Sequence, residues 1–370
     1  MAGIYTCDKS SSDSDSNLYT SCHGYQTKRK NKQCIMDMVS HWTKNTAEHL
    51  GLFYNEEPTP LDEFKIMLSS SGLKFVSGTP AKLTLPFKDE SKHLLDTLID
   101  LTKNCVNVSF SIDENKPDFF KGTVKKEMSA ARRTLWERRV TIDAEHQDDD
   151  GYTGELVPKE SGLSRFQLQT CYYHTYDFLK TYLHFLENGS DNKGWNKSDF
   201  TTLLSQFITI FMLSPQPGKS NKRNQVLGGV PTTSIPELRI VSYEQFPLTL
   251  GVITVIEEKL NMPCDMDLYS TEDIPANAVG QHAGEMLLEY EYSVFEEAVF
   301  GILCFRTKLI FTFLKMSDGH FHSILNHKDH SDICASSTIY HTKPYDYLIK
   351  EQRDAILQML FWLGLQTSIK

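Results

Sequence analysis

The sequence lacks the features that mark secreted, membrane-embedded and disulfide-stabilised proteins. It shows no N-terminal signal peptide and no apolar run long enough to cross a bilayer, so we expect neither standard secretion nor membrane association. Its 8 cysteines are scattered without a C-x-x-C pair. The simplest interpretation is a reduced intracellular protein of the nucleus or the cytoplasm.

Positive charge is also scarce, since 48 acidic residues against 38 Lys and Arg leave a net charge of −10. Such a chain does not bind nucleic acid over its whole surface, so binding would need a local basic groove. The run from Lys121 to Arg139 is one candidate. With Trp136 it suits either a helix that tracks phosphates and stacks on a base, or a solvated helix with a buried Trp. Its candidate contacts are Lys125, Lys126, Arg132, Arg133, Arg138 and Arg139.

A second basic candidate is the Pro- and Gly-rich stretch from Ser214 to Gly229, predicted to be a mobile loop. Lys219, Lys222 and Arg223 lie in it. They would either hold a nucleic-acid strand or belong to a plain surface connection.

Composition divides the chain into four parts, with 40% hydrophobic residues to build a core. Residues 1–33 are Ser- and Asp-rich and then basic, which predicts a disordered tail. Its run Lys28–Lys32 is either a nuclear localisation signal or a solubilising segment. Residues 34–142 are expected to form a mainly helical α+β accessory module, 143–162 an acidic linker, and 163–370 the main α/β core.

Periodicity and turn residues predict the elements within these parts. Ser198 is expected to cap the helix that runs to Met212. The aromatic residues of the helix Leu163–Leu186 are expected in the core, with a protein-binding surface as the alternative. Other predicted helices are Cys34–Asn55, Thr59–Met67, Glu90–Leu101, Ala276–Phe295 and Tyr345–Leu365, and other predicted strands are Lys82–Phe87, Val106–Ile112, Lys308–Met316 and His320–Leu325.

The stretch Ile235–Lys259 combines buried strands with charge. Two short apolar strands are predicted at Leu238–Tyr243 and Gly251–Ile256. The first follows Pro236-Glu237, and the second ends in Glu257-Glu258-Lys259. Charges at the end of a buried strand are costly unless they find partners or a metal, which is typical of a functional site.

Pro-Glu, a spacer and Glu-x-Lys at the end of an apolar strand resemble the PD-(D/E)XK nuclease superfamily, whose fold is restriction-endonuclease-like. The resemblance covers about 228–370 and includes a following helix with Gln281 near its start. It implies a mixed sheet flanked by helices and a nuclease that hydrolyses phosphodiesters of nucleic acid, with DNA favoured over RNA. Glu237 and Glu257 would hold Mg²⁺ or Mn²⁺, and Lys259 would assist the attacking water.

Two departures from the family pattern leave other functions open. Glu237 stands where the family has Asp, and the predicted helix Thr201–Met212 lacks the acidic residue that members often supply there. Glu155 and Glu160 are possible substitutes. The alternatives are an inactive nuclease-fold scaffold that binds nucleic acid, and a protein-interaction module.

A histidine-rich segment near the C-terminus offers zinc ligands without a standard spacing. Zinc would accept these side chains, and the predicted hairpin would put His320 and His322 on one face, but the spacing matches no standard zinc module. The residues are His320, His322, His327, His330, Cys334 and His341.

Overall fold

The computed structural model describes residues 37–72, 99, 102–103, 109–110, 121–129, 165–188, 195–218, 222–241, 248–256, 274–326 and 335–368. The predicted tail and acidic linker lie outside these residues, as do most of the strands and the helix predicted between Lys82 and Ile112. No helix of the described part is long and apolar enough to cross a membrane.

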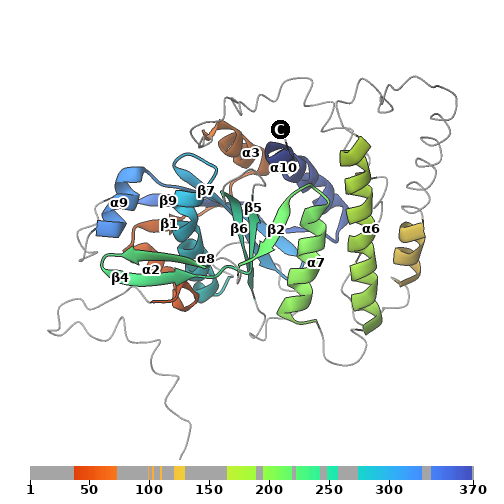
Figure 1. Cartoon of the computed structure of the whole chain (residues 1–370), viewed down its shortest axis with the longest axis horizontal. Helices are drawn as coiled ribbons and strands as arrows, with labels where there is room; N and C mark the ends of the chain where they lie inside the picture. Colours follow the sequence, from red (N-terminus) through yellow and green to blue (C-terminus); the bar gives the residue numbers. More distant parts are fainter. Residues whose placement is uncertain are drawn as a thin grey trace, which may run out of the picture.

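A mixed, eight-stranded sheet forms the centre of the fold (Figure 1). Its order is β1-β9-β8-β7-β6-β5-β2, and β10 also pairs with β8. Neighbours β5 and β6 are antiparallel, β6 and β7 are parallel, and β7 and β8 are antiparallel. The strands are β1 (Leu52–Tyr54), β2 (Ser214–Pro217), β5 (Leu238–Val241), β6 (Thr249–Ile256), β7 (Ala298–Phe305), β8 (Lys308–Lys315), β9 (Ser337–His341) and β10 (Tyr345–Asp346), with β3 (Arg223–Leu227) and β4 (Val230–Ser234) as a separate hairpin.

Helices cover both faces of the sheet (Figure 1). Because side chains alternate along a strand, Ile253 and Phe300 enter one core while their neighbours Val252 and Val299 enter the other. The first core contains residues of α3 (Leu61–Ser70), α6 (Arg165–Asn188), α7 (Lys197–Thr209) and α10 (Lys350–Ser368). The second contains residues of the 3-10 helix η2 (Val39–His41), α2 (Lys44–His49), α8 (Ala276–Glu289) and α9 (Asp318–Asn326). The predicted α/β class, a mixed sheet flanked by helices, is confirmed.

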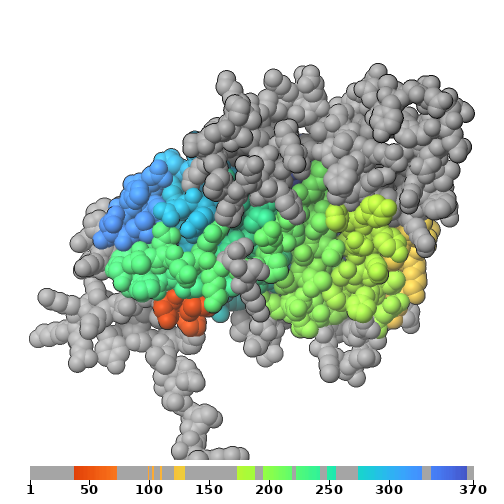
Figure 2. All heavy atoms as spheres, in the orientation of Figure 1, coloured from red at the N-terminus to blue at the C-terminus, as the bar shows by residue number. Residues whose placement is uncertain are grey.

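The first described segment belongs to the same sheet as the C-terminal strands. Strand β1 pairs in parallel with β9, with Leu52 opposite Ser337. The Thr59 N–H donates to the His341 carbonyl at 2.7 Å and extends this contact. Within the described part of the predicted helix Cys34–Asn55, α2 confirms an α-helix at Lys44–His49 only. Residues Leu52–Tyr54 form a strand instead, because a partner far along the chain overrides local helix propensity. In Figure 2 this segment (red) lies beside the β3–β4 hairpin, consistent with the bridge between Met38 and Thr233.

Helix α8 is buried along nearly its whole length rather than on one face. It ends at Glu289 and is followed by the 3-10 turn η5 (Tyr290–Tyr292), so the predicted α-helix Ala276–Phe295 is too long. Two glycines of α8 allow the segment 37–50 to pack closely against this helix. A Cβ on Gly280 would lie 2.1 Å from the carbonyl carbon of Thr43, and one on Gly284 would lie 2.6 Å from the Trp42 ring. Segment 37–50 thus covers the side of α8 that the sheet does not.

Replacing Gly280 by Ala is expected to destabilise the protein by about 2 kcal/mol. Alanine favours a helix over glycine by up to about 1 kcal/mol, but the new methyl group would collide with backbone that has little freedom to move. Urea unfolding would measure the loss. Gly122 is a matched control, since it is also helical and has nothing within 4 Å of its added Cβ, so Gly122→Ala should be neutral or stabilising. Equal effects at both glycines would contradict the close packing of Thr43.

The predicted strand His320–Leu325 is wrong, because these residues form helix α9. Ser317 caps this helix, and its Oγ accepts a hydrogen bond from the His320 N–H at 3.2 Å. Spacing within the helix then buries His320, Phe321 and Ile324 together. The Ser317-Asp318 pair was thus a helix-start signal rather than a hairpin turn.

Two further predictions between α6 and β5 need correction. The stretch Ser214–Gly229 is not a loop, since it contains β2 and β3. Helix α7 is capped by Asn196 rather than Ser198, and the Asn196 side chain accepts from the N–H groups of Ser198 and Asp199. Asn196 is the better cap because the Asp199 carboxylate accepts the Asn196 N–H in return, which satisfies both groups.

Several predicted elements are confirmed with shifted ends. The two strands of the Ile235–Lys259 stretch are β5 and β6, and they lie side by side as an antiparallel pair. Helices α3, α6 and α10 and strand β8 also agree with the sequence pattern. Strand β7 was missed, although its run AVFGILCF is apolar throughout and is buried at every position.

Candidate functional site

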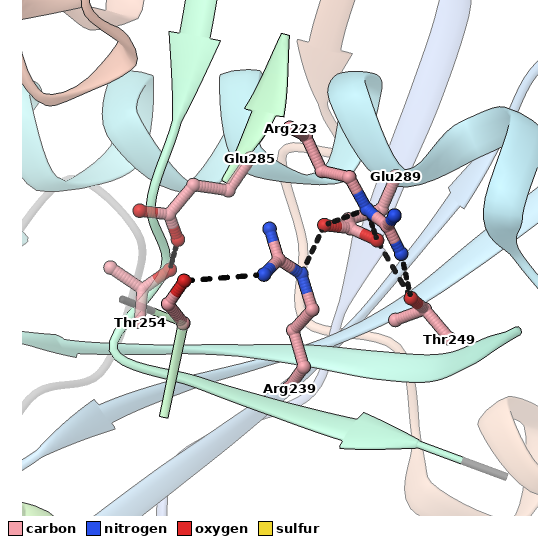
Figure 3. A network of polar contacts seen from close by, with 7 residues as sticks. Arg223, Arg239, Thr249, Thr254, Glu285 and Glu289 are labelled. Atoms are coloured by element: carbon pink, nitrogen blue, oxygen red, sulfur yellow. Dashed lines mark hydrogen bonds and ion pairs between the residues drawn. The ribbon is translucent and has the colours of Figure 1, made fainter. Parts of the chain in front are cut away.

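The face of the sheet under α8 carries an unusual row of polar contacts. Helix–sheet interfaces are normally apolar, yet α8 places two carboxylates, Glu285 and Glu289, one turn apart against this face (Figure 3). Both are buried. Glu285 meets Thr254 on β6, and Glu289 meets two arginines and Thr249. Buried charges of this kind need partners, so these contacts define where α8 can sit.

Glu237 lies immediately before β5, close to the Glu285 end of this row. Its carbonyl oxygen accepts the Gly218 N–H at 3.1 Å, which fixes the backbone next to β2. One carboxylate oxygen accepts the Val255 N–H of β6 at 3.2 Å, and the other accepts the ammonium of Lys197. The side chain of Glu237 is 15% exposed and that of Lys197 is 31% exposed, so this end of the row reaches the surface.

Glu285 is the fully buried acid nearest to Glu237. The Thr254 hydroxyl donates to one of its oxygens, and the Gln281 amide donates to the other at 2.8 Å. Burial raises the pKa of Glu285 to about 8, and the negative charge of Glu237 contributes to the increase. Glu285 is therefore mostly protonated at neutral pH, which avoids two adjacent carboxylates.

His282 extends the buried network from Thr254 to β8. Its two ring nitrogens lie 2.7 Å from the hydroxyls of Thr254 and Thr312. Gly301 on β7 leaves room for the ring, since a Cβ there would lie 2.7 Å from the imidazole. Burial lowers the pKa of His282 to about 3, so the ring is neutral. A hydroxyl can donate or accept, which lets one neutral imidazole satisfy both threonines.

Glu289 holds the second cluster together. Its carboxylate accepts from Nε of Arg223 at 3.2 Å, from Nε of Arg239 and from the Thr249 hydroxyl at 2.7 Å (Figure 3). Arg239 is almost completely buried, and the Arg223 guanidinium also stacks on the Tyr292 ring at 3.7 Å. Glu289 thus joins two arginines, from β3 and β5, through one buried carboxylate.

The structure brings together some of the predicted site residues and leaves others undescribed. Glu237 and Gln281 both adjoin Glu285, one through its charge and one through a hydrogen bond. Glu257 and Lys259 lie outside the described residues, as do Glu155 and Glu160. Sequence reasoning missed Lys197, Thr254 and Glu285. Only Glu285 carried a local signal, because it follows Gln281 by four residues and so shares its helix face.

Four of the predicted nucleic-acid contacts, Lys125, Lys126, Lys222 and Arg223, lie among the described residues. Lys125 and Lys126 lie exposed on a described helix at 121–129, where Lys125 pairs with Glu187 at 3.2 Å. Lys222 is exposed beside β3, whereas Arg223 is turned inward to Glu289. Part of the predicted basic loop is therefore a strand, and its Arg223 is paired with Glu289. Lys219, Arg132, Arg133, Arg138 and Arg139 lie outside the described residues.

The described histidines of the proposed zinc set serve structural contacts. His320 lies between the Ser337 hydroxyl at 2.5 Å and the Leu50 carbonyl at 2.9 Å. His341 faces the carbonyls of Asn55 and Thr342. His322 is exposed on α9. His327, His330 and Cys334 lie outside the described residues.

The Glu237 carboxylate at this end of the row keeps acceptor capacity beyond its two hydrogen bonds. A carboxylate offers about four lone-pair sites, and Glu237 uses one on each oxygen for Lys197 and Val255. Within the described ranges, no three or more His, Cys, Asp or Glu side chains gather as a metal site. Mg²⁺ commonly takes one or two protein carboxylates and completes its shell with water and phosphate.

Comparison with known proteins found no matching family model, no matching curated sequence and no matching solved structure.

Proposed function

We propose that the chain is a divalent-metal-dependent nuclease with its site at Glu237. The observation that carries this proposal is the position of the partly exposed Glu237 carboxylate beside the buried Glu285, which accepts a hydrogen bond from the partly exposed Gln281, near the end of β6. A buried carboxyl group with a raised pKa beside a partly exposed carboxylate is an arrangement found often at functional sites.

The arrangement of the elements supports the same function. Strands β5 and β6 form an antiparallel pair, and α8 then leads to β7, which is parallel to β6. Ligands of α/β proteins bind near the carboxyl ends of such strands. This order agrees with the resemblance to PD-(D/E)XK nucleases, in which a strand pair is followed by a helix carrying Gln and by another strand.

Glu257 lies outside the described residues, and the proposal assigns it the second ligand position from its place in the sequence. Val255, whose N–H binds Glu237, precedes Glu257 by two residues, and two residues span at most about 7 Å. Glu237 and Glu257 would hold the cation, which offsets charge on a phosphate and acidifies a bound water. Lys259, two residues further, remains the predicted amine beside that water.

The other residues of the site have definite roles in this proposal. The Val255 N–H holds the Glu237 carboxylate in one orientation. Glu285 accepts the Gln281 amide and so directs the Gln281 side chain, which is partly exposed and free to contact a water through its carbonyl oxygen. Lys197 supplies positive charge next to the position of the phosphate.

Glu237→Gln and Glu257→Gln are each expected to slow metal-dependent cleavage about a hundredfold or more. Glutamine keeps the size of the side chain and an acceptor for the Val255 N–H, but it binds a divalent cation poorly. Fragment release from single- and double-stranded DNA and RNA would be followed during a Mg²⁺ or Mn²⁺ titration. Glu63 is exposed on α3, so Glu63→Gln is the matched control and should retain full activity.

Unchanged cleavage in both site variants would contradict the nuclease assignment. Absence of cleavage by the natural chain would instead favour a second function, a nuclease-fold scaffold that binds nucleic acid without cutting it. The specific observation behind this alternative is the Lys197 ammonium on Glu237, which already neutralises the carboxylate. The scaffold predicts salt-sensitive binding that weakens when Lys125 and Lys126 are replaced by Glu.

A further inference from the structure

Lys197 occupies a position that its own helix does not favour. It is the first residue of α7, where the positive end of the helix dipole repels an ammonium group. Nothing local explains a lysine there, whereas Asp199 in the same turn is the charge expected at this end. The partner that accounts for Lys197 is Glu237, forty residues along the chain.

Glu237 does not depend on Lys197 for its orientation. The Val255 N–H holds one carboxylate oxygen at 3.2 Å, and the Gly218 N–H holds the backbone carbonyl at 3.1 Å. The Lys197 ammonium contacts only the other carboxylate oxygen. If that ammonium moved away, Glu237 would still present the freed oxygen at the same place. The contact with Lys197 is therefore separable from the positioning of Glu237.

Lys197 is also able to move. Its side chain is 31% exposed, and a lysine carries its charge on a flexible four-carbon stem that adapts readily to a phosphate. A divalent cation at the freed oxygen and the ammonium beside it repel each other, so the two cations compete for Glu237. A phosphate group of a bound strand would attract both.

We propose that Lys197 is an exchangeable counter-ion that occupies Glu237 in the free protein and transfers to a phosphodiester when substrate binds. This inference rests on the proposed cation site at Glu237 and adds a way in which cation binding at that site is regulated. Divalent cation and nucleic acid then bind with positive linkage, because each favours the state in which Lys197 has left the carboxylate. The free protein consequently binds the cation weakly.

Mn²⁺ binding by the full chain tests the inference without any measurement of cleavage. In the absence of nucleic acid, Lys197→Met is expected to bind Mn²⁺ at least about tenfold more tightly than the natural chain, because one repelling charge is gone. Adding Glu237→Gln to Lys197→Met should abolish the gain. Lys197→Arg keeps the charge and should bind like the natural chain. Lys44→Met is the matched control, since Lys44 also begins a helix and pairs with an exposed Glu48.

A second titration uses a phosphorothioate DNA strand that resists hydrolysis, with the same strand alone as the blank. The natural chain should now bind Mn²⁺ nearly as tightly as Lys197→Met, so that the difference between them disappears. The inference would be overturned if the natural chain and Lys197→Met bound Mn²⁺ equally without DNA, or if DNA left a difference between them unchanged. The absence of detectable Mn²⁺ binding by both proteins would also overturn it. Failure of the proposed nuclease function would be distinguishable from these outcomes, because the chain would then show this linkage between Mn²⁺ and DNA binding but would cut no strand.

Discussion

Glu289→Ala is expected to lower the free energy of unfolding by about 3–5 kcal/mol. The substitution removes the carboxylate that both arginines share, so each of these cations loses this counter-charge. Arg239 has no route to solvent, because its side chain is only 2% exposed. The Thr249 hydroxyl also loses its acceptor. Urea unfolding monitored by Trp fluorescence would measure the difference in stability.

Two further variants separate charge from volume at this position. Glu289→Gln keeps the size of the side chain and an acceptor oxygen, so it should recover only a minor part of the loss. Glu291, just beyond α8, is exposed and bonds only to Gln225 at 3.3 Å among the contacts described, so Glu291→Ala should stay within about 0.5 kcal/mol of the natural chain. A loss below about 1 kcal/mol for Glu289→Ala would mean that the two arginines are not desolvated.

The stability of the protein is expected to fall between about pH 6.5 and pH 8 because of Glu285. Its pKa of about 8 in the folded protein exceeds its ordinary value of 4.5, so between these values the folded state holds a proton that the unfolded state has lost. Stability from this carboxyl group therefore decreases by up to about 1.4 kcal/mol per pH unit as pH rises through that window, and the loss is complete above the folded pKa.

His282 has the opposite effect in a lower window. Its pKa falls from 6.5 to about 3 on folding, so stability from this group rises with pH between those values. Where the two windows overlap, between about pH 4.5 and 6.5, the slopes cancel, and only the Glu285 contribution remains above pH 6.5.

Glu285→Gln tests this linkage directly. A neutral amide should remove the decline between pH 6.5 and 8 and make the variant more stable than the natural chain at pH 8.5, as measured by urea unfolding across the pH series. Glu63→Gln on the exposed face of α3 should retain the natural slope. A variant that declines in parallel with the natural chain would show that Glu285 is ionised at neutral pH.

Much of the fold could be predicted from the sequence because it depends on local patterns. The apolar runs around Ile253 and Ile310 predicted strands, and the spacing of Ile356, Leu360 and Leu363 predicted the last helix. Some predictions failed because a local signal was overlooked, as at Ser317 before α9, and others failed because a distant partner decided the structure. Strand β1 forms because β9 lies beside it, and the Arg223 stretch forms a strand because β4 pairs with it. Sequence alone showed neither partner.

The candidate site also has a part that the sequence predicts and a part that depends on the tertiary structure. The sequence by itself determined that Pro236-Glu237 precedes a buried strand and that Gln281 lies near the start of the helix that follows, since both follow from the order of apolar and polar residues. Only the tertiary structure decided that Lys197 rests on Glu237, that Thr254 meets Glu285 and that Glu289 gathers two arginines. Periodicity tells which residues face a core, but the partner of a buried charge is fixed only when the sheet and α8 are packed together.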